Sequence, residues 1–344
     1  MKIGILTFHN GLNHGAFLQV FATLNFLRKK YNDVSVINYK NKKHLFNEDI
    51  YQIFKYRNPF RIIDFFKKRK AFRIDQKELL LTKFTTNIKD VKSFDLDVVI
   101  VGSDVVWNTK IFGFDKIYFG GLDNSKQISY AASFGWSYNQ NSNSMIKEGI
   151  LKFSKLSVRD DNSKKIIKSL INYSPRIVLD PTFLCDWKNY EYNSSRVKKY
   201  NNYILIYAYK LTNEEINFVR DFAKKNNLIC VSIGYRQKWC NENLIDVGPF
   251  EWLSFFNKAS YVVTSTYHGT IFSIIYQKKF YVSINNKIKS RVLSLFKLVN
   301  IEDEFFLNIE KNFYDSRNLI DLILPEINSS KDWLIQAIEN FDIK

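Results

Sequence analysis

The stretch KIGILTF at residues 2–8 opens the chain with an apolar run, as expected of a strand that is buried on both faces of a parallel sheet. A polar turn with two glycines follows at residues 9–15, and residues 16–30 then carry apolar side chains at helical spacing. The next apolar run, residues 34–39, completes a strand–helix–strand unit. This opening predicts an α/β fold that is built on a parallel sheet.

The same alternation of apolar runs and helical patterns recurs along the chain in two sets. The further strands expected in the first set lie at residues 96–101, 126–133, 154–159 and 176–179. A polar stretch rich in Asn, Tyr and Lys (residues 183–202) separates them from a second set at residues 203–209, 228–233, 261–264 and 280–284. We therefore predict two Rossmann-like parallel-sheet domains that face a cleft. The expected parts are an N-terminal domain, a C-terminal domain and a terminal helix, at residues 1–190, 191–325 and 326–344.

A helical insertion is expected within the N-terminal domain, at about residues 41–92. This segment is basic and aromatic, and its large apolar side chains include Phe54, Phe60, Ile63, Phe65 and Phe66. Because they recur at helical spacing, the pattern favours packing in the core over contact with a membrane.

The composition is that of a folded protein with a basic surface. The chain has 344 residues, which suits two domains of about 150 residues each, and 46% of the residues are hydrophobic. The net charge of +17 indicates either an anionic partner or lysines that are merely solvated. No zinc-finger spacing or RNP-type motif accompanies the charge, so we expect no specific nucleic-acid partner. A phosphorylated substrate and the surface of an anionic membrane remain as partners.

Cysteine usage and hydropathy predict a cytoplasmic protein. Cys185, Cys230 and Cys240 are odd in number and show no CxxC spacing, which argues against a disulfide framework and against a zinc site. Met1 leads directly into the first expected strand, without the n-region and h-region of a signal peptide. No run approaches the roughly 18 apolar residues of a membrane span, so any contact with the inner face of the cell membrane is expected to be peripheral.

Polar residues follow the carboxyl ends of the expected strands, where parallel α/β sheets bind their ligands. The candidates in the first half are Asn13, His14, Gly15, Ser103, Asp104 and Arg159. Taken one by one, each has a structural alternative, because turns everywhere favour Gly, Ser, Asp and Asn. Asp104 could instead cap the following segment, and Arg159 could pair with Asp160 or Asp161 at the surface.

His268 is the most informative candidate in the second half. It lies in Ser265–Gly269 (STYHG), between an expected strand and a helix that we expect to begin at Thr270. The N-terminus of a helix favours an anion, and a histidine beside it can deliver a proton near neutral pH. The alternative is an imidazole that satisfies a backbone carbonyl in a capped turn, and spacing alone slightly favours that alternative. Arg291 could likewise reach an anion or lie on a basic helix face.

Seven short motifs follow one another along the chain. They are residues 13–19 (NHGAFLQ), 101–108 (VGSDVVWN), 130–135 (YAASFG), 157–160 (SVRD), 179–182 (LDPT), 249–253 (PFEWL) and 263–269 (VTSTYHG). Their number, order and spacing make the chain resemble the polysaccharide pyruvyl transferase family. The resemblance implies a fold similar to the two-domain glycosyltransferases of the GT-B type. It also implies transfer of a pyruvyl group from phosphoenolpyruvate onto two hydroxyls of a sugar in a cell-surface polymer. In this scheme phosphoenolpyruvate is a co-substrate, and neither a cofactor nor a metal is required.

The resemblance also implies roles for individual residues. His268 matches the family's general acid, and Arg159 matches an arginine that binds the donor phosphate. Some relatives carry a second arginine where this chain has Thr266, so another cation, Arg291 or Lys289, is expected to bind the donor anion. The expected donor side also includes Thr266, Tyr267 and Gly269. The expected acceptor side comprises Asn13, His14, Gly15, Ser103 and Asp104.

The sequence does not identify the acceptor sugar. The resemblance implies a sugar or a lipid-linked oligosaccharide, a precursor of a bacterial capsule or exopolysaccharide. A GT-B glycosyltransferase that uses a nucleotide sugar is the alternative enzyme. A basic binding protein for nucleic acid or for an anionic membrane is the alternative of a different class.

Overall fold

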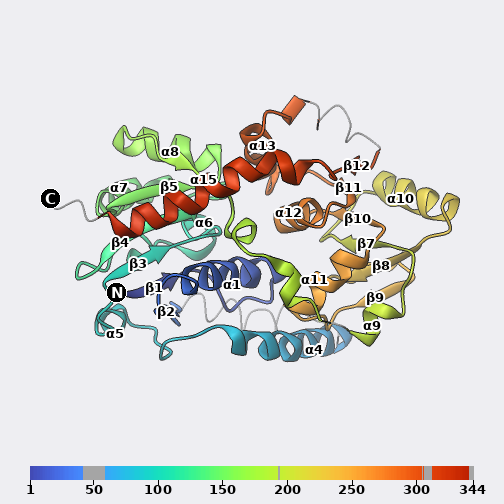
Figure 1. Cartoon of the computed structure of the whole chain (residues 1–344), viewed down its shortest axis with the longest axis horizontal. Coiled ribbons are helices and arrows are strands. Elements are labelled where there is room, and N and C mark those ends of the chain that lie inside the picture. The colour runs from blue at the N-terminus through green and yellow to red at the C-terminus, as the bar shows by residue number, and fades with distance from the viewer. Residues whose placement is uncertain (42–58, 193, 304, 306–311, 341–344) are drawn as a thin grey trace. The chain divides into compact units, whose positions relative to one another are not determined.

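The computed structural model describes residues 1–41, 59–192, 194–303, 305 and 312–340 (Figure 1). Its contacts divide the chain into two compact units. Unit 1 comprises Met1–Arg57, Lys77–Cys185 and Glu326–Lys344, and unit 2 comprises Asn58–Gln76 and Asp186–Pro325. The first part of the predicted helical insertion, including Phe54, lies outside the described residues.

Unit 1 is built on a six-stranded sheet of order β2-β1-β3-β4-β5-β6, in which all neighbouring strands are parallel. Its strands are β1 (Lys2–Leu6), β2 (Asp33–Val36), β3 (Val98–Val101), β4 (Lys126–Ala132), β5 (Lys155–Val158) and β6 (Arg176–Ile177). Every residue of β3 is buried, as its continuous apolar sequence predicts. The helices are α1 (His14–Arg28), α5 (Ile88–Lys92), α6 (Thr109–Phe112), α7 (Asn143–Ile150), α8 (Asp161–Ile171) and the greater part of α15 (Leu319–Glu339).

Unit 2 is built on a second six-stranded sheet, of order β12-β11-β10-β7-β8-β9. Its strands are β7 (Tyr203–Tyr207), β8 (Ile229–Ile233), β9 (Glu242–Leu244), β10 (Tyr261–Thr264), β11 (Lys279–Val282) and β12 (Tyr314–Asp315), of which β12 alone is antiparallel to its neighbour. The helices are α4 (Pro59–Asp75), α9 (Ser195–Lys198), α10 (Asn213–Lys225), α11 (Pro249–Lys258), α12 (Tyr267–Ile275) and α13 (Lys289–Leu298). Short 3-10 helices of the two units lie at Gln76–Glu78, Lys116–Tyr118, Gln140–Ser142, Pro181–Leu184 and Trp187–Tyr190.

The faces of the second sheet follow from the alternation of side chains along β7. Ile204 and Ile206 pack with Val219 of α10, whereas the rings of Tyr203 and Tyr207 contact Phe255 and Trp252 of α11. Figure 1 accordingly shows α10 on one face of this sheet and α11 and α12 on the other. The carboxyl ends of β7, β8 and β10 therefore lie at one edge, with helices on both faces.

The predicted fold class, two Rossmann-like parallel-sheet domains, is confirmed by these two sheets. The assignment of segments differs from the prediction in two places. Helix α4, expected in an insertion of the N-terminal domain, groups by its contacts with unit 2, and the terminal helix groups with unit 1. Helix α15 also begins at Leu319 rather than at residue 326, because the chain stays helical through Pro325, a residue that usually ends a helix.

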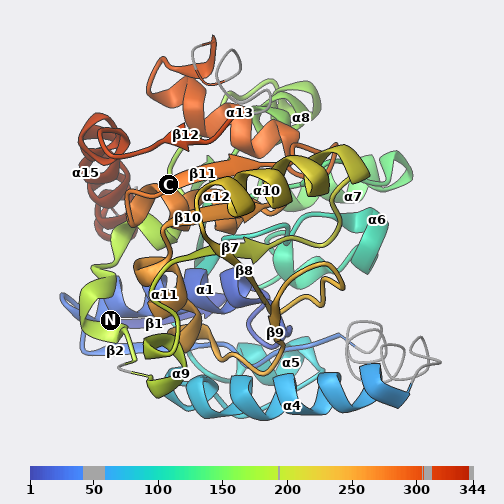
Figure 2. The same ribbon diagram turned by 90° about the vertical axis from the view of Figure 1, so that its right-hand side faces the viewer.

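The expectation that the Phe-rich pattern of the insertion faces the core is wrong for two side chains. Ile63 is 50% exposed and Phe66 is 52% exposed, whereas Phe72 on the opposite side of α4 is buried. The helix packs against α11 through that buried side, and both views show the two helices side by side (Figures 1 and 2). Among the described residues, no helix is both long enough and apolar enough to cross a membrane.

Candidate functional site

The turn between β10 and α12 is fixed by two threonine hydroxyls. Thr264 Oγ1 donates to the carbonyl oxygen of Tyr207 (2.8 Å) and accepts from the backbone N–H of Thr266 (3.1 Å). Thr266 is the N-cap of α12, and its Oγ1 accepts from the backbone N–H of Gly269 (3.0 Å). The predicted helix start at Thr270 is therefore wrong. The helix begins at Tyr267, so that His268 lies within its first turn.

Tyr267 connects His268 with Arg291. The rings of Tyr267 and His268 lie 5.6 Å apart between centroids, and the Arg291 guanidinium lies 5.2 Å from the centroid of the Tyr267 ring. All three side chains are buried, and Arg291 Nη2 donates to the carbonyl oxygen of Lys287 (2.7 Å). Arg291 thus lies beside the start of α12 and not on an exposed helix face. Lys289, the other predicted cation, is exposed at the start of α13.

Ser265 holds neighbouring strand ends of unit 2 together, a role that the sequence did not reveal. Its Oγ accepts from the backbone N–H of Tyr209, which follows β7 (2.9 Å), and its carbonyl oxygen accepts from Asn285 Nδ2, which follows β11 (3.3 Å). These bonds align three adjacent strand ends beside His268. The turn is therefore rigid without help from a ligand.

Arg159 joins two carboxylates in the interior of unit 1. Its Nη1 donates to Asp180 Oδ2 (2.7 Å), its Nη2 donates to Asp104 Oδ1 (3.1 Å), and Ser103 Oγ lies 3.4 Å from Nη1. The guanidinium is fully buried, whereas the Asp104 side chain retains 12% of its exposure. The alternative of a surface pair with Asp160 or Asp161 is excluded because the guanidinium is buried, and Arg159 lies with Ser103 and Asp104 as one cluster.

Asp160 is engaged elsewhere, which explains why it does not pair with Arg159. Its Oδ1 accepts from the backbone N–H of Ser163 (2.8 Å) at the start of α8, and its Oδ2 accepts from Ser133 Oγ (2.5 Å). A carboxylate that caps a helix is stabilised by the N–H groups and the dipole of the helix N-terminus, so its charge is compensated without an arginine.

Asp180 and Gln19 join this cluster in unit 1, although the sequence marked Asp180 only by its place after an expected strand and gave Gln19 no role. Asp180 is buried and also accepts from the backbone N–H (3.0 Å) and the hydroxyl (2.8 Å) of Thr182. Gln19 Oε1 accepts from the backbone N–H of Ser103 (3.2 Å) and its Nε2 donates to Thr7 Oγ1 (3.2 Å). The available signal was a polar residue at an otherwise apolar position of α1, within the motif at residues 13–19.

The glycine turn after β1 is a helix cap in this structure. Asn13 Oδ1 accepts from the backbone N–H of Ala16 (3.2 Å), and α1 begins at His14. His14 and Gly15 are both buried in the first turn of α1. His9 is also buried, and its ring nitrogens lie 3.2 Å from the carbonyl oxygen of Thr7 and 3.1 Å from Asn38 Oδ1.

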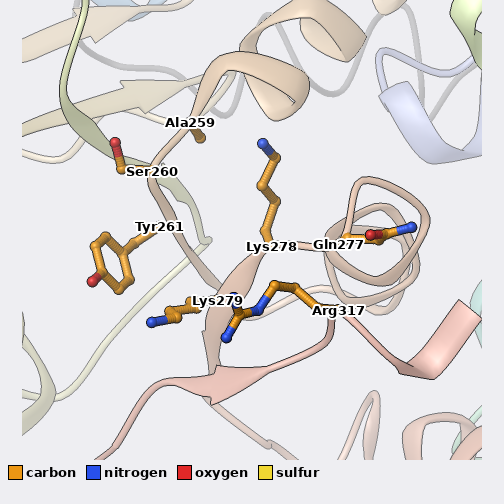
Figure 3. Close-up of a pocket in the computed structure, with 7 residues that line it drawn as sticks. All are labelled: Ala259, Ser260, Tyr261, Gln277, Lys278, Lys279 and Arg317. Atoms are coloured by element: carbon orange, nitrogen blue, oxygen red, sulfur yellow. The ribbon is translucent and has the colours of Figure 1, made fainter.

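A shallow cavity of about 350 Å³ lies at the opposite edge of the second sheet, where β10 and β11 begin (Figure 3). Its cations are Lys278, Lys279 and Arg317. Lys278 Nζ donates to the carbonyl oxygen of Asn257 (2.5 Å), and Arg317 forms several hydrogen bonds with Asp315. None of the predicted site residues lines this cavity. Within the described residues, no group of three His, Cys, Asp or Glu side chains is arranged to hold a metal ion.

The sequence model of the polysaccharide pyruvyl transferases matches residues 13–287. The chain belongs to this family. The match includes both the Arg159 cluster and the His268 turn. A search of the curated proteins found no match to the sequence.

Solved structures of similar fold support the architecture of this pyruvyl transferase family member. Anabaena Alr3699/HepE in complex with UDP is similar over 98% of this chain and 99% of its own, with a TM-score of 0.55 and 9% identity. The UDP-GlcNAc 2-epimerase of Methanocaldococcus jannaschii, in complex with UDP-GlcNAc and UDP, covers the same shares, with a TM-score of 0.51 and 13% identity. At such identities the likeness shows the fold alone, which is of the GT-B type.

Proposed function

We propose that this protein transfers a pyruvyl group from phosphoenolpyruvate onto two hydroxyls of one sugar in a polysaccharide precursor, forming a cyclic ketal and releasing phosphate. The observation that carries the proposal is His268 in the first turn of α12, joined to Arg291 through Tyr267. A cation and a helix N-terminus favour the anionic groups of the donor, and the histidine supplies a proton beside them.

The proposed chemistry starts with protonation of the donor. The His268 imidazolium gives a proton to the methylene carbon of phosphoenolpyruvate, and the double-bond electrons form the new C–H bond. The central carbon becomes an oxocarbenium-like centre, and the first sugar hydroxyl adds to it. The C–O bond to phosphate then breaks with its electron pair on phosphate, and the second hydroxyl adds to the same carbon. Of the two hydroxyl protons, one restores the imidazolium and the other leaves with phosphate.

Arg291 is the proposed partner of the donor anion, in place of the arginine that some relatives carry at the position of Thr266. Thr266 cannot supply a charge, and its hydroxyl already caps α12. Arg291 is held by Tyr267 and by the carbonyl oxygen of Lys287, so that its guanidinium is preorganised beside the helix start. Lys289, exposed nearby in sequence, is the second cation proposed for the donor phosphate.

For Arg159, the geometry supports a positioning role more strongly than donor binding. Its guanidinium already engages Asp104 and Asp180, so a phosphate would have to displace a buried carboxylate. We propose that Arg159 orients Asp104, whose partly exposed carboxylate accepts a hydrogen bond from an acceptor hydroxyl. Ser103, Asn13, His14 and Gly15 complete the proposed acceptor side in unit 1.

The test is an assay of donor use by the full-length protein. Phosphoenolpyruvate and a lipid-linked or nucleotide-linked sugar acceptor should yield inorganic phosphate and a pyruvylated acceptor, observed by mass spectrometry. His268→Gln should lower kcat by about 10²- to 10⁴-fold, since a general acid typically contributes that much. Its melting temperature should stay near that of the wild type. Consumption of a nucleotide sugar with no use of phosphoenolpyruvate would establish the glycosyltransferase alternative instead.

A further inference from the structure

Helix α4 presents an unusual outer face to solvent. Ile63 is 50% exposed, Phe66 is 52% exposed and Ile74 is 55% exposed. Lys67, Lys70 and Arg73 are exposed among them. At the roughly 100° per residue of an α-helix, these six side chains fall within an arc of about 120°. We call these six residues the outer face of α4.

The opposite side of α4 anchors the helix to unit 2 without help from the outer face. Lys68 Nζ donates to the carbonyl oxygen of Gly234 (3.2 Å) and lies 4.8 Å from the centroid of the Tyr235 ring. Asp75 Oδ2 accepts from the backbone N–H of Phe250 (2.9 Å). The fold therefore does not need the three exposed apolar side chains, which remain available to a partner.

The two acidic residues of the helix lie outside this arc and are both engaged. Asp64 accepts two hydrogen bonds from Arg236 Nη2 (2.8 and 2.9 Å) and one from its Nε (3.0 Å), and Asp75 binds the backbone of α11. The outer face consequently combines three cations with three large apolar side chains and carries no carboxylate. A helix with this composition lies in the headgroup region of an anionic bilayer, where cations meet phosphates and apolar side chains enter the acyl boundary.

We propose that the outer face of α4 binds the surface of an anionic phospholipid bilayer. Charge complementarity favours this partner over a second copy of the chain. Each copy carries a net charge of +17, so the cations of two copies would repel each other at such an interface. The surface is separate from the His268 turn, and the proposal stands whether or not the protein transfers pyruvate. If it does, the bilayer holds the protein beside acceptors that are carried on lipid.

The experiment is co-sedimentation of the full-length protein with vesicles. Binding is expected to vesicles that contain phosphatidylglycerol and not to vesicles of phosphatidylcholine alone, and it should weaken as salt is added. The triple variant Lys67→Gln, Lys70→Gln, Arg73→Gln should reduce the partition constant by about a hundredfold, at about fivefold for each cation near the surface. The triple variant Ile63→Ser, Phe66→Ser, Ile74→Ser should reduce it by at least about tenfold.

The matched control removes the same charge from another helix of unit 2. Arg220, Lys224 and Lys225 on α10 are exposed, and their triple change to Gln should alter binding by less than about threefold. If the α4 and α10 variants lose equal amounts of vesicle binding, total charge alone attracts the protein to the vesicles, and the proposal is overturned. Equal binding to neutral vesicles would overturn it as well. A concentration-dependent dimer that Phe66→Ser abolishes, measured by light scattering, would assign the face to self-association instead.

Discussion

Arg159 bridges two carboxylates in the interior of unit 1, and the role that we propose for it depends on that bridge. A guanidinium offers two parallel donors in a fixed plane, which lets it bridge Asp104 and Asp180, while an ammonium is a point charge. Removing one partner from a buried ion pair leaves an uncompensated charge, which typically costs about 3–5 kcal/mol. The position of Asp104 therefore depends on the arginine and not merely on a positive charge.

Arg159→Lys is expected to lower both stability and kcat while leaving donor affinity almost unchanged. Urea unfolding should show a loss of about 3 kcal/mol, because an ammonium lacks the two separate donor nitrogens with which the guanidinium bridges the buried carboxylates. Steady-state kinetics should show a KM for phosphoenolpyruvate within about threefold of the wild type, whereas the KM for the acceptor should rise. A folded variant with a large increase in the donor KM alone would show that Arg159 binds the donor phosphate.

Gly269 follows His268 because the turn leaves no room for a side chain. A Cβ at this position would lie 2.1 Å from Thr264 Oγ1 and 2.7 Å from Thr266 Oγ1, the two hydroxyls that fix the start of α12. Gly269→Ala should destabilise unit 2 by about 1–3 kcal/mol, the usual cost of overpacking, and should also reduce activity by displacing His268. Denaturant unfolding and phosphate release measure the two effects. Thr264→Ala removes one obstructing hydroxyl and two hydrogen bonds of the turn, so Gly269→Ala is also compared within a Thr264→Ala background. Its cost should be smaller there, and an undiminished cost would contradict the steric explanation.

Contacts between residues that are distant in sequence could not be predicted for the candidate residues, whereas contacts between neighbours in sequence could. The place of His268 and Gly269 between a strand and a helix was predictable from their neighbours in sequence, although α12 begins at Tyr267 and not at Thr270. The carboxylates that hold Arg159 lie 55 and 21 residues away, so no local spacing could distinguish them from the adjacent Asp160 and Asp161. Asp180 was noted for its place after an expected strand, but its contact with Arg159 could not be predicted for the same reason.

The elements that sequence patterns predicted are the long or strongly apolar ones. β3, β7 and β10 are central strands with continuous apolar runs. β9 and β12 contain only three and two residues and carry polar side chains. They are too short to show the alternation of apolar and polar residues from which a strand is predicted. The outer face of α4 was misread because helical spacing identifies an apolar stripe but not what covers it.

Helix α4 carries a buried lysine whose ionisation should depend on the fold. Lys68 packs on the ring of Tyr235, and burial lowers the pKa of its ammonium to about 7. In the unfolded chain this pKa returns to an ordinary value near 10.4. Between these two values the unfolded chain binds one proton more than the folded chain. The contribution of Lys68 to the free energy of unfolding therefore rises with pH across this window.

Lys68→Met should remove this dependence. The difference in unfolding free energy between Lys68→Met and the wild type should be largest near pH 7 and shrink toward pH 10, by at most about 1.4 kcal/mol per pH unit. Taking the difference cancels the titration of the other ionisable groups, which both proteins share. Tyr235 faces Lys68, and burial raises its pKa well above the ordinary value, so that it does not titrate in this window in the folded state. Lys70→Met, a change of an exposed lysine on the same helix, should show no such trend, and equal trends in the two variants would contradict the assignment.

At the scale of the whole molecule, each unit is assembled from segments that are distant in sequence. Unit 1 takes its last segment from the end of the chain, where Lys126 Nζ donates to the carbonyl oxygens of Ile338 (3.2 Å) and Asn340 (2.6 Å). The ring of Trp333 contacts that of Tyr130 in β4. Because β4 lies between β3 and β5, the terminal helix supports an interior strand of the sheet.

The end of α15 should therefore control the stability of unit 1 more than that of unit 2. Leu334 and Ile338 are fully buried, and changing both to Ala should destabilise unit 1 by several kcal/mol, at about 2–5 kcal/mol for each site. Hydrogen exchange followed by mass spectrometry should show faster exchange in β4 and β5, with β7 and β10 little changed. The matched control is the pair Leu322→Ala and Leu324→Ala, which are half-exposed on the same helix and should cost less than about 1 kcal/mol. Equal acceleration in both sheets would show instead that the two units unfold as one cooperative body, with α15 supporting both.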